Sequence, residues 1–469
     1  MSPFGLNAQA PASRVLGSWG LLFSTCGHPA AHQMQHHLDA PLLLLNFPSH
    51  EAACPRSIFP IFHASIVTLA MQERIPKVLC AIACMTVLSV FSTPVMAQVA
   101  DSTFWIERDT SLVADAARTK VRVAIWDSGV DTVLFHDRLA RDAQGRPIIR
   151  GYDAFKERQD LPLAVLPDSI ARQVAQLNRW LLAMDDIDSG VDSPQARELN
   201  AWLDTITKAR EDAFYGTIDR YIGYTHGTAL ADIAVHGLPD AELINARMEW
   251  WHGSPPVPCW SRELADKEAA SIRDLLDFVV ANGARVVVMS WMRTERGYVR
   301  NLEQCAPTMA EAERKELARY TVERIRAELI AGMQEAPHVL FIGAAGNGGV
   351  ELAKADQATR FALPNFLLVG AVDKQGGAVS WSNTGPEVII RARGERVPAR
   401  LPDGTLSHPT GTSMAAPVVA NAVAKMLAAE PGLSVQEIKT LLLQTATPME
   451  DEGPPLLHTR LAVRAAGGR

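Results

Sequence analysis

Four polar side chains in this chain of 469 residues have the types and the order that nucleophilic catalysis requires. Asp127 follows the apolar run VRVAIW, His226 lies in THGTALADIAVHG, and Ser413 lies in GTSMAAP. A serine hydroxyl becomes a strong nucleophile when an imidazole accepts its proton and a carboxylate orients that imidazole. Asn347, in GAAGNGG, is flanked by glycines that let a substrate approach its side-chain amide, a suitable donor to an oxyanion. Together the four residues predict an acyl-transfer site.

Each of these residues also has a common structural role. Ser413 could cap a helix, Asp127 could close a turn, and Asn347 could supply left-handed backbone. For any one of them alone the structural role is the preferred interpretation, but their joint occurrence beside suitable elements favours catalysis. The dipeptide HG recurs at His236, which falls about 15 Å along the helix that we expect to start at His226, so it cannot share the role.

Strands and helices that could position these residues alternate along the chain. The runs VRVAIW, AELINARM, RVVVMSW, HVLFIGAAG and FLLVGAV are apolar and β-branched, which is typical of strands buried on both faces. Helical stretches such as ELADKEAASIRDLLDFVVANG lie between them. Repeated βα units predict a three-layer α/β/α fold with a mostly parallel sheet, which binds ligands beyond the carboxyl ends of its strands. The helix after Ser413 places the serine at its positive end, with Pro417 in the first turn.

These four stretches resemble the subtilisin-like serine protease (subtilase) family, whose catalytic residues occur in the order Asp, His, Ser. The resemblance covers roughly residues 120–447. It implies a secreted endopeptidase that hydrolyses polypeptides through an acyl-enzyme and requires no cofactor. By this likeness Ser413 is the nucleophile and His226 the general base. Asp127 is then the orienting partner of the base, and Asn347 is the oxyanion donor.

The resemblance also implies where a substrate lies. The VVVMSW and FIGAAG strands would flank its main chain and pair with it as added strands do. Ser290, Trp291, Gly343 and Ala345 would then border the cleft. Two other functions stay open: an acyl transferase or transpeptidase that uses the same triad, and a secreted binding module with an inert triad.

His226 follows Asp127 by 99 positions, which is a longer separation than is common in that family and indicates an insertion at about 157–215. Apolar residues recur there at steps of three or four, first in DSIARQVAQLNRWLLAM and then in PQARELNAWLDTITKARED. The first stripe is Ile170, Val174, Leu177, Leu181 and Met184, and the second is Leu199, Trp202, Ile206 and Ala209. Two amphipathic helices are predicted, the second beginning at Pro194, and they form a hairpin that we expect to narrow access to the cleft.

The turn of this hairpin is acidic. Asp186, Asp188 and Asp192 surround Gly190 and offer hard oxygen ligands of the kind that bind calcium as a structural ion. Their spacing does not reproduce a calcium loop of about twelve residues. A solvated acidic turn is therefore the preferred interpretation, and no other metal is expected.

The N-terminal hundred residues differ from the rest. Residues 1–70 show no sustained helical or strand period, and we expect them to be disordered or outside the native protein, with translation starting at Met71. From there a basic MQERIPK, an apolar VLCAIACMTVLSVFS and a final PVMA predict a signal peptide at 71–97. The apolar run is shorter than the roughly 18 residues of a membrane span, so a signal peptide is preferred over an uncleaved anchor. The protein is expected to be secreted or periplasmic, without stable membrane association.

The predicted mature chain starts with a short N-terminal extension. The extension covers residues 98–120, the peptidase domain 121–450 and a C-terminal tail 451–469. Cys259 and Cys305 are the cysteines that remain after cleavage, and in an oxidising compartment a disulfide is preferred over two free thiols. The net charge of −7 offers no basic stripe, which argues against nucleic acid as a partner.

Overall fold

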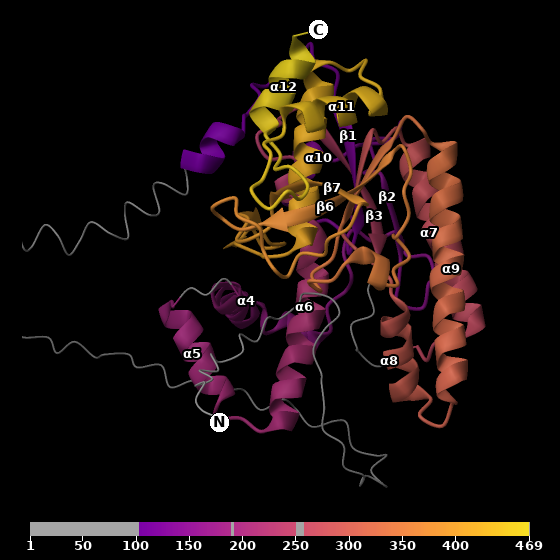
Figure 1. Cartoon of the computed structure of the whole chain (residues 1–469). Helices are drawn as coiled ribbons and strands as arrows, with labels where there is room; N and C mark the ends of the chain where they lie inside the picture. The colour runs from indigo at the N-terminus through magenta and orange to yellow at the C-terminus, as the bar shows by residue number, and fades with distance from the viewer. Residues whose placement is uncertain (1–102, 189–191, 250–257, 469) are drawn as a thin grey trace, which may run out of the picture. The chain divides into compact units, whose positions relative to one another are not determined.

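The computed structural model describes residues 103–188, 192–249 and 258–468. The predictions for residues 1–70 and for the signal peptide at 71–97 lie outside these ranges. Within them, a seven-stranded sheet is covered by helices on both faces (Figure 1). The expected three-layer α/β/α architecture is confirmed.

All seven strands are parallel, in the order β2-β3-β1-β4-β5-β6-β7. Their bounds are β1 Val121–Asp127, β2 Ile149–Tyr152, β3 Ala241–Met248, β4 Val286–Met289, β5 Leu340–Ala344, β6 Phe366–Val372 and β7 Val388–Arg393. Most strand residues are buried because both faces are covered, which explains the absence of polar alternation in the sequence. Asp127 is the last residue of the interior strand β1, so it lies at the carboxyl edge of the sheet.

Alternate residues of β1 belong to two different cores. Val123 and Ile125 pack beneath α6 and α10, whereas Ala124 and Trp126 pack beneath α7 and α9 (Figure 1). The bounds of these helices are α6 Lys208–Ala234, α7 Arg262–Ala281, α9 Glu311–Glu335 and α10 Thr412–Ala429. The length and mean hydropathy of α10 would suffice to cross a membrane, but 89% of it is buried inside the protein. It is therefore the central core helix of its layer.

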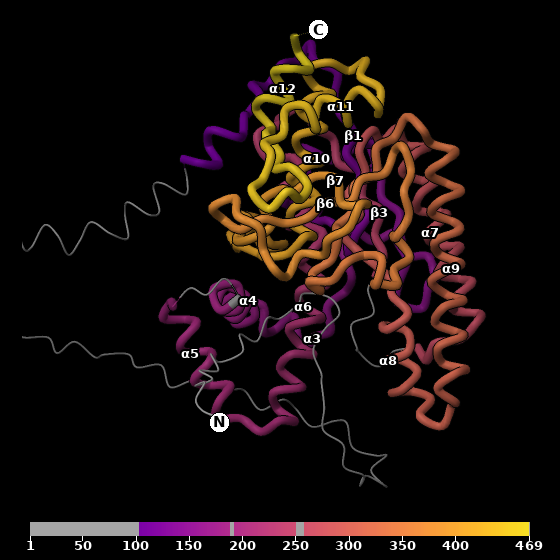
Figure 2. Tube along the Cα trace, viewed as in Figure 1, coloured from indigo at the N-terminus to yellow at the C-terminus, as the bar shows by residue number. Residues whose placement is uncertain are grey.

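The insertion forms helices, as predicted (Figure 2). Their buried side chains make a small hydrophobic core. The helices of the insertion are α3 Asp168–Ala171, α4 Val174–Asp188 and α5 Pro194–Leu203. The core contains Leu177, Leu181 and Leu199 from the predicted stripes, together with Trp180 and residues of α6. The hairpin is thus confirmed except for its turn at 189–191, which lies outside the described residues.

The predicted end of the second helix in the insertion was wrong. The second helix was expected to run through Ile206 and Ala209, but α5 ends at Leu203 and α6 begins at Lys208. The Thr205 hydroxyl donates to the carbonyl of Trp202, and this local bond competes with continuation of the helix. Helix α6 then runs unbroken past position 226, so His226 lies inside this helix and not at its start, where the sequence had placed it.

The segments outside 121–450 belong to the same folded unit as the sheet. Arg460 donates to the carbonyl of Asp109 at 2.9 Å, and the Leu457 amide donates to Arg391 on the edge strand β7 at 2.9 Å. Helices α11 Val435–Thr445 and α12 Thr459–Gly467 pack on each other, and α12 also packs on α10. The C-terminal segment is therefore no loose tail, because it covers a sheet edge that would otherwise be open.

Candidate active site

Asp127 and His226 meet at the carboxyl end of β1. His226 Nδ1 lies 2.8 Å from Asp127 Oδ1, and both side chains are buried. A carboxylate oxygen accepts hydrogen bonds, so Nδ1 is the donor to Asp127 and Nε2 is the ring nitrogen left to act as a base. This is the orientation that a general base requires.

Close packing of α6 on the end of β1 holds this pair in place. A Cβ atom on Gly227 would lie 2.3 Å from the carbonyl oxygen of Gly129, so only glycine lets the helix approach so near. The Gly227 amide also donates to Ser128 Oγ at 3.0 Å. The glycine after His226 and the serine after Asp127 thus fix the distance between base and carboxylate.

Ser413 is not a helix cap. Gly411 occupies the N-cap position of α10, and Ser413 is the second residue of that helix, where it is almost completely buried. Its carbonyl accepts a hydrogen bond from Ser290 Oγ at 2.8 Å, which ties the start of α10 to the end of β4. Ser413 thus lies in the first turn of α10, at the positive end of the helix dipole, which favours a negative charge that develops there.

The side chain of Asn347 is held by the residue before the nucleophile. Asn347 Oδ1 accepts from the amide of Thr412 at 2.8 Å and from Thr412 Oγ1 at 2.7 Å. Thr412 Oγ1 in turn accepts from the amide of Gly346 at 2.9 Å. Oδ1 is the acceptor of this amide and Nδ2 is its donor, so the two bonds from Thr412 fix which way the donor points. Among the described residues other than glycine, positive φ occurs at Lys156, Arg396 and Glu452, so Asn347 does not serve as a left-handed backbone position.

His236 lies outside this site. It follows the C-terminal end of α6, and its carbonyl accepts from Asn421 Nδ2 at 2.8 Å. The structure thus brings Asp127 to His226 and Asn347 to the residue beside Ser413. The roles assigned to these four residues stay predictions, now supported by geometry.

The four residues expected to border a cleft have different surroundings in the structure. Ser290 contacts the backbone of Ser413, as described above. The Trp291 ring is buried in the opposite core, 5.3 Å from the ring of Trp126 in an edge-to-face arrangement. Gly343 lies within β5, and Ala345 is fully buried. Of the four residues, Ser290 is the one whose side chain has a hydrogen bond to the nucleophile segment among the described contacts.

Two residues at this site were missed in the sequence. Thr412 anchors Asn347, and its place directly before the serine was the signal. Met292 follows Trp291, and its Cε would lie 2.5 Å from a Cβ atom built on Gly346. The Met292 side chain therefore stands over the residue that precedes Asn347. Nothing in the local pattern indicated this contact, because it joins two loops that are far apart in the sequence.

A buried charge cluster holds the loop that follows β4. Glu268 accepts from Arg293 Nε at 2.8 Å and from the Tyr298 hydroxyl at 2.6 Å, and Lys156 Nζ lies 3.5 Å away. Burial alone would raise the pKa of Glu268, but Lys156 and Arg293 outweigh it and lower this pKa to about 2. The Arg293 guanidinium also lies over the Trp291 ring, 5.5 Å from its centre. The cluster rigidifies the chain beside Ser290.

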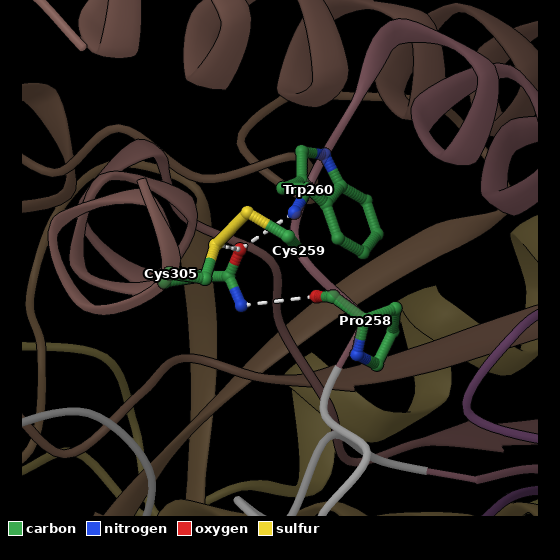
Figure 3. Close-up of a disulfide and its surroundings, with 5 residues drawn as sticks. Pro258, Cys259, Trp260 and Cys305 are labelled. Atoms are coloured by element: carbon green, nitrogen blue, oxygen red, sulfur yellow. Dashed lines mark hydrogen bonds between the residues drawn. A yellow bond between two sulfur atoms is a disulfide. The ribbon is translucent and has the colours of Figure 1, made fainter. Parts of the chain in front are cut away.

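Cys259 and Cys305 form a disulfide, as their number had indicated (Figure 3). Their Cα atoms are 5.5 Å apart, and the bond joins the segment before α7 to the end of α8, Glu295–Cys305. Asn301 reinforces the junction, accepting from the Trp260 amide at 2.8 Å and donating to the Pro258 carbonyl at 3.2 Å.

In the part of the acidic turn that the structure describes, Asp186 and Asp192 contact other side chains and do not form a metal-binding group. Asp186 pairs with Arg396 at 3.2 Å and accepts from Gln195 at 2.7 Å, while Asp192 pairs with Arg197 at 2.8 Å. Gly190 lies outside the described ranges. Across those ranges no group of three or more acidic, histidine or cysteine side chains is arranged to bind a metal.

Comparison with known proteins identifies the class of this fold and site. The subtilase family model matches residues 118–460, and the chain belongs to this family. Subtilisin DY from Bacillus licheniformis is 34% identical over 132 residues, which are 28% of this chain and 48% of that protein. The thermostable alkaline protease of Halalkalibacterium halodurans is 32% identical over 138 residues, 29% of this chain and 36% of that protein. The matches thus span half or less of these relatives.

Solved structures of similar fold include a cold-adapted subtilisin-like serine proteinase and the PatG macrocyclase domain. The first has 16% identity and a TM-score of 0.43, and the alignment covers 75% of this chain and 94% of that one. The second has 18% identity and a TM-score of 0.44, with 75% and 93% coverage.

Proposed function

We propose that this protein is a secreted serine endopeptidase that cleaves polypeptides through an acyl-enzyme on Ser413. The observation that carries the proposal is that the expected base and the expected oxyanion donor are each held in place by a neighbouring side chain. His226 is oriented by Asp127 at 2.8 Å, and Asn347 is oriented by Thr412, the residue before Ser413. Subtilase membership supports the same assignment.

The proposed reaction uses these side chains alone. Ser413 Oγ attacks the peptide carbonyl carbon while His226 Nε2 takes its proton, and Asp127 stabilises the imidazolium. The carbonyl oxygen becomes an anion that accepts from Asn347 Nδ2. The imidazolium then protonates the leaving amine, the peptide bond breaks, and a water molecule repeats the sequence to release the acid. No step calls for a cofactor.

Export is part of the proposal and rests on the sequence at 71–97. The Cys259–Cys305 disulfide supports it, because such bonds persist in oxidising compartments. The expected location is secreted or periplasmic.

A covalent label tests the mechanism. A fluorophosphonate should label the wild-type protein, which should also digest casein, and Ser413→Ala should abolish both because it removes the hydroxyl on which the acyl-enzyme forms. Labelling without digestion would favour an acyl transferase. Absence of both in folded protein would favour a binding module. Full activity of Ser413→Ala would refute the proposed mechanism.

A further inference from the structure

The segment directly before Ser413 is a narrow ribbon, residues 394–411, which we call the nucleophile ribbon. It contains two short strands, β8 Ala399–Arg400 and β9 Leu406–Ser407, which pair in antiparallel register. The ribbon is closed at its base, where the amide of Gly411 donates to the carbonyl of Gly394 at 2.7 Å. A two-stranded ribbon of this size is marginally stable on its own. Its shape must therefore be maintained by contacts with other elements.

Helix α4 of the insertion supplies such contacts along the length of the ribbon. Near the base, Asp186 pairs with Arg396 at 3.2 Å. Further out, Asp185 Oδ2 accepts from Ser407 Oγ at 2.9 Å. At the tip, Asn178 donates to Asp403 at 2.7 Å. Three side chains of α4 thus contact the ribbon at its base, in its middle and at its tip.

These contacts are partly removed from water, which makes them stronger than exposed pairs. Asn178 is 5% exposed and Asp186 is also 5% exposed. The Tyr221 hydroxyl donates to Asn178 Oδ1 at 2.6 Å, so this amide is fixed from both sides. Leu401, at the tip of the ribbon, is buried within the apolar core of the insertion.

The contact at Arg396 leads towards the nucleophile. The backbone of Arg396 has φ of 47°, in the left-handed region that non-glycine residues rarely adopt. Its amide donates to Thr410 Oγ1 at 3.1 Å, three residues before Ser413. Such a conformation persists where surrounding contacts enforce it. The ion pair to Asp186 is one of these contacts.

Helix α6, which carries His226, also contacts the nucleophile ribbon. Arg400 pairs with Asp232 of α6 at 2.6 Å, six residues after His226. The nucleophile ribbon is therefore held between α4 of the insertion and the helix of the general base.

From these contacts we infer that the insertion positions Ser413: Asp185 and Asp186 of α4 are positioning residues that act through Ser407 and Arg396 of the nucleophile ribbon. The inference rests on the proposed function. It replaces the expectation that the hairpin only limits access, because an access barrier need not be bonded to the segment that carries the nucleophile. The two models differ in their effect on a substrate too small to meet a barrier.

The test uses the full-length exported protein and the variants Asp186→Asn, Arg396→Gln, Arg396→Lys and the double variant Asp186→Asn/Arg396→Gln. Asp212→Asn is the matched control, since Asp212 is an aspartate of the same insertion that pairs with Lys208 and is 48% exposed. Two quantities are measured: the rate of fluorophosphonate labelling, and kcat and KM for a small peptide ester. Thermal melting confirms that each variant is folded at the assay temperature.

We expect Asp186→Asn and Arg396→Gln each to lower kcat and the labelling rate about tenfold with little change in KM, because small misplacements at a reacting centre are costly. The double variant should be no worse than either single variant, since each removes the same pair. Arg396→Lys should retain most of the rate. Asp212→Asn should match the wild type.

Failure of this inference is distinguishable from failure of the proposed function. If the wild type neither labels nor turns over the ester, the proposed function fails. If the wild type is active and the folded variants keep its kcat and labelling rate, the insertion does not position Ser413. Normal ester hydrolysis with altered cleavage of large proteins would restore the access model and overturn the inference. Should Asp186→Asn fail to fold, Ser407→Ala, which removes a single hydroxyl, replaces it with the same expected result.

Discussion

At the scale of single residues, the site depends on side chains that hold other side chains. Asp127 orients His226, and Thr412 orients Asn347 through two hydrogen bonds of 2.8 and 2.7 Å. These bonds order the groups before a substrate arrives. Preorganisation of this kind lets charge develop in the transition state without a cost of reorganisation.

Asn347→Ala should lower kcat by about 10²- to 10³-fold, the range known from removal of such a donor in a subtilisin, with a smaller effect on KM. The fold should persist, because the substitution removes a single side-chain amide from a loop and leaves the buried strands and helices unchanged. Steady-state kinetics on a peptide substrate provide the measurement. A kcat equal to that of the wild type would assign the oxyanion to another donor.

Met292→Gly should broaden the side chains accepted on the acyl side of the cleaved bond. That residue of a substrate must lie near both Ser413 and Asn347, and hence near Gly346, over which the Met292 side chain stands. Substrates with a large residue there should gain about tenfold in kcat/KM, the scale of a few buried methylene groups. Profiling on a peptide library is the measurement, and Met309→Ala, a partly buried methionine between α8 and α9, is the control. An unchanged profile would show that Met292 does not limit this position.

At the scale of elements, helix α4 contacts the nucleophile ribbon through Asp185, a carboxyl group with a shifted pKa. Burial raises the pKa of Asp185 to about 6, against the hydrogen bonds from Ser407 and the backbone of His408. Asp186 raises this pKa further, and Arg396 lowers it. The folded protein therefore favours the protonated form of Asp185 more than the unfolded chain does.

Stability should depend on pH accordingly. The raised pKa of Asp185 adds to the free energy of unfolding, and this contribution is fully present below pH 3.8, the ordinary pKa of the group. The contribution is lost as pH rises through about 6 and Asp185 ionises in the folded protein. Asp185→Asn cannot ionise, so between about pH 4 and 7 its free energy of unfolding should rise relative to that of the wild type. Urea unfolding of both proteins across this range provides the test. Parallel pH profiles would show that Asp185 is not a buried acid.

The Cys259–Cys305 disulfide links the segment before α7 to the end of α8. The bond closes a loop of 46 residues, and the chain-entropy model gives it about 3 to 4 kcal/mol. Cys259→Ser/Cys305→Ser should lower the free energy of unfolding by up to this amount. Chemical denaturation measures the loss, and two free thiols in denatured wild-type protein would contradict the pairing.

At the scale of the whole molecule, the chain before β1 is part of the peptidase fold. Lys425 of α10 is fully buried and pairs with Asp109 at 2.9 Å. Removing one partner of a buried pair leaves a charge that is costly to keep from water. Any processing of the N-terminus therefore has to leave Asp109 in place.

The exported protein should begin at Gln98. Cleavage after Ala97 satisfies the signal-peptide pattern and retains the segment that carries Asp109. Mass analysis of the N-terminal peptide provides the measurement. Peptides from residues 1–70 in the exported form would contradict both the signal peptide and the start at Met71.

The sequence alone was enough to predict the family and the layers of this fold. Apolar runs without alternation predicted a parallel sheet because burial on both faces removes the need for polar residues. Asp127, Asn347 and Ser413 were recognisable because each lies where a strand or helix places it at the edge of that sheet. The cysteine pair was recognisable from its number. These signals are local, and short segments carry them.

Tertiary structure decided what depends on contacts between distant segments. The end of α5 at Leu203, the anchoring of Asn347 by Thr412 and the bonds between α4 and the nucleophile ribbon join residues that no local period relates. The surroundings of Trp291 were also decided there: this residue was expected to border the cleft, but its ring is buried against Trp126 in the core beneath α7 and α9. Local pattern determines which element forms, whereas packing determines what that element contacts.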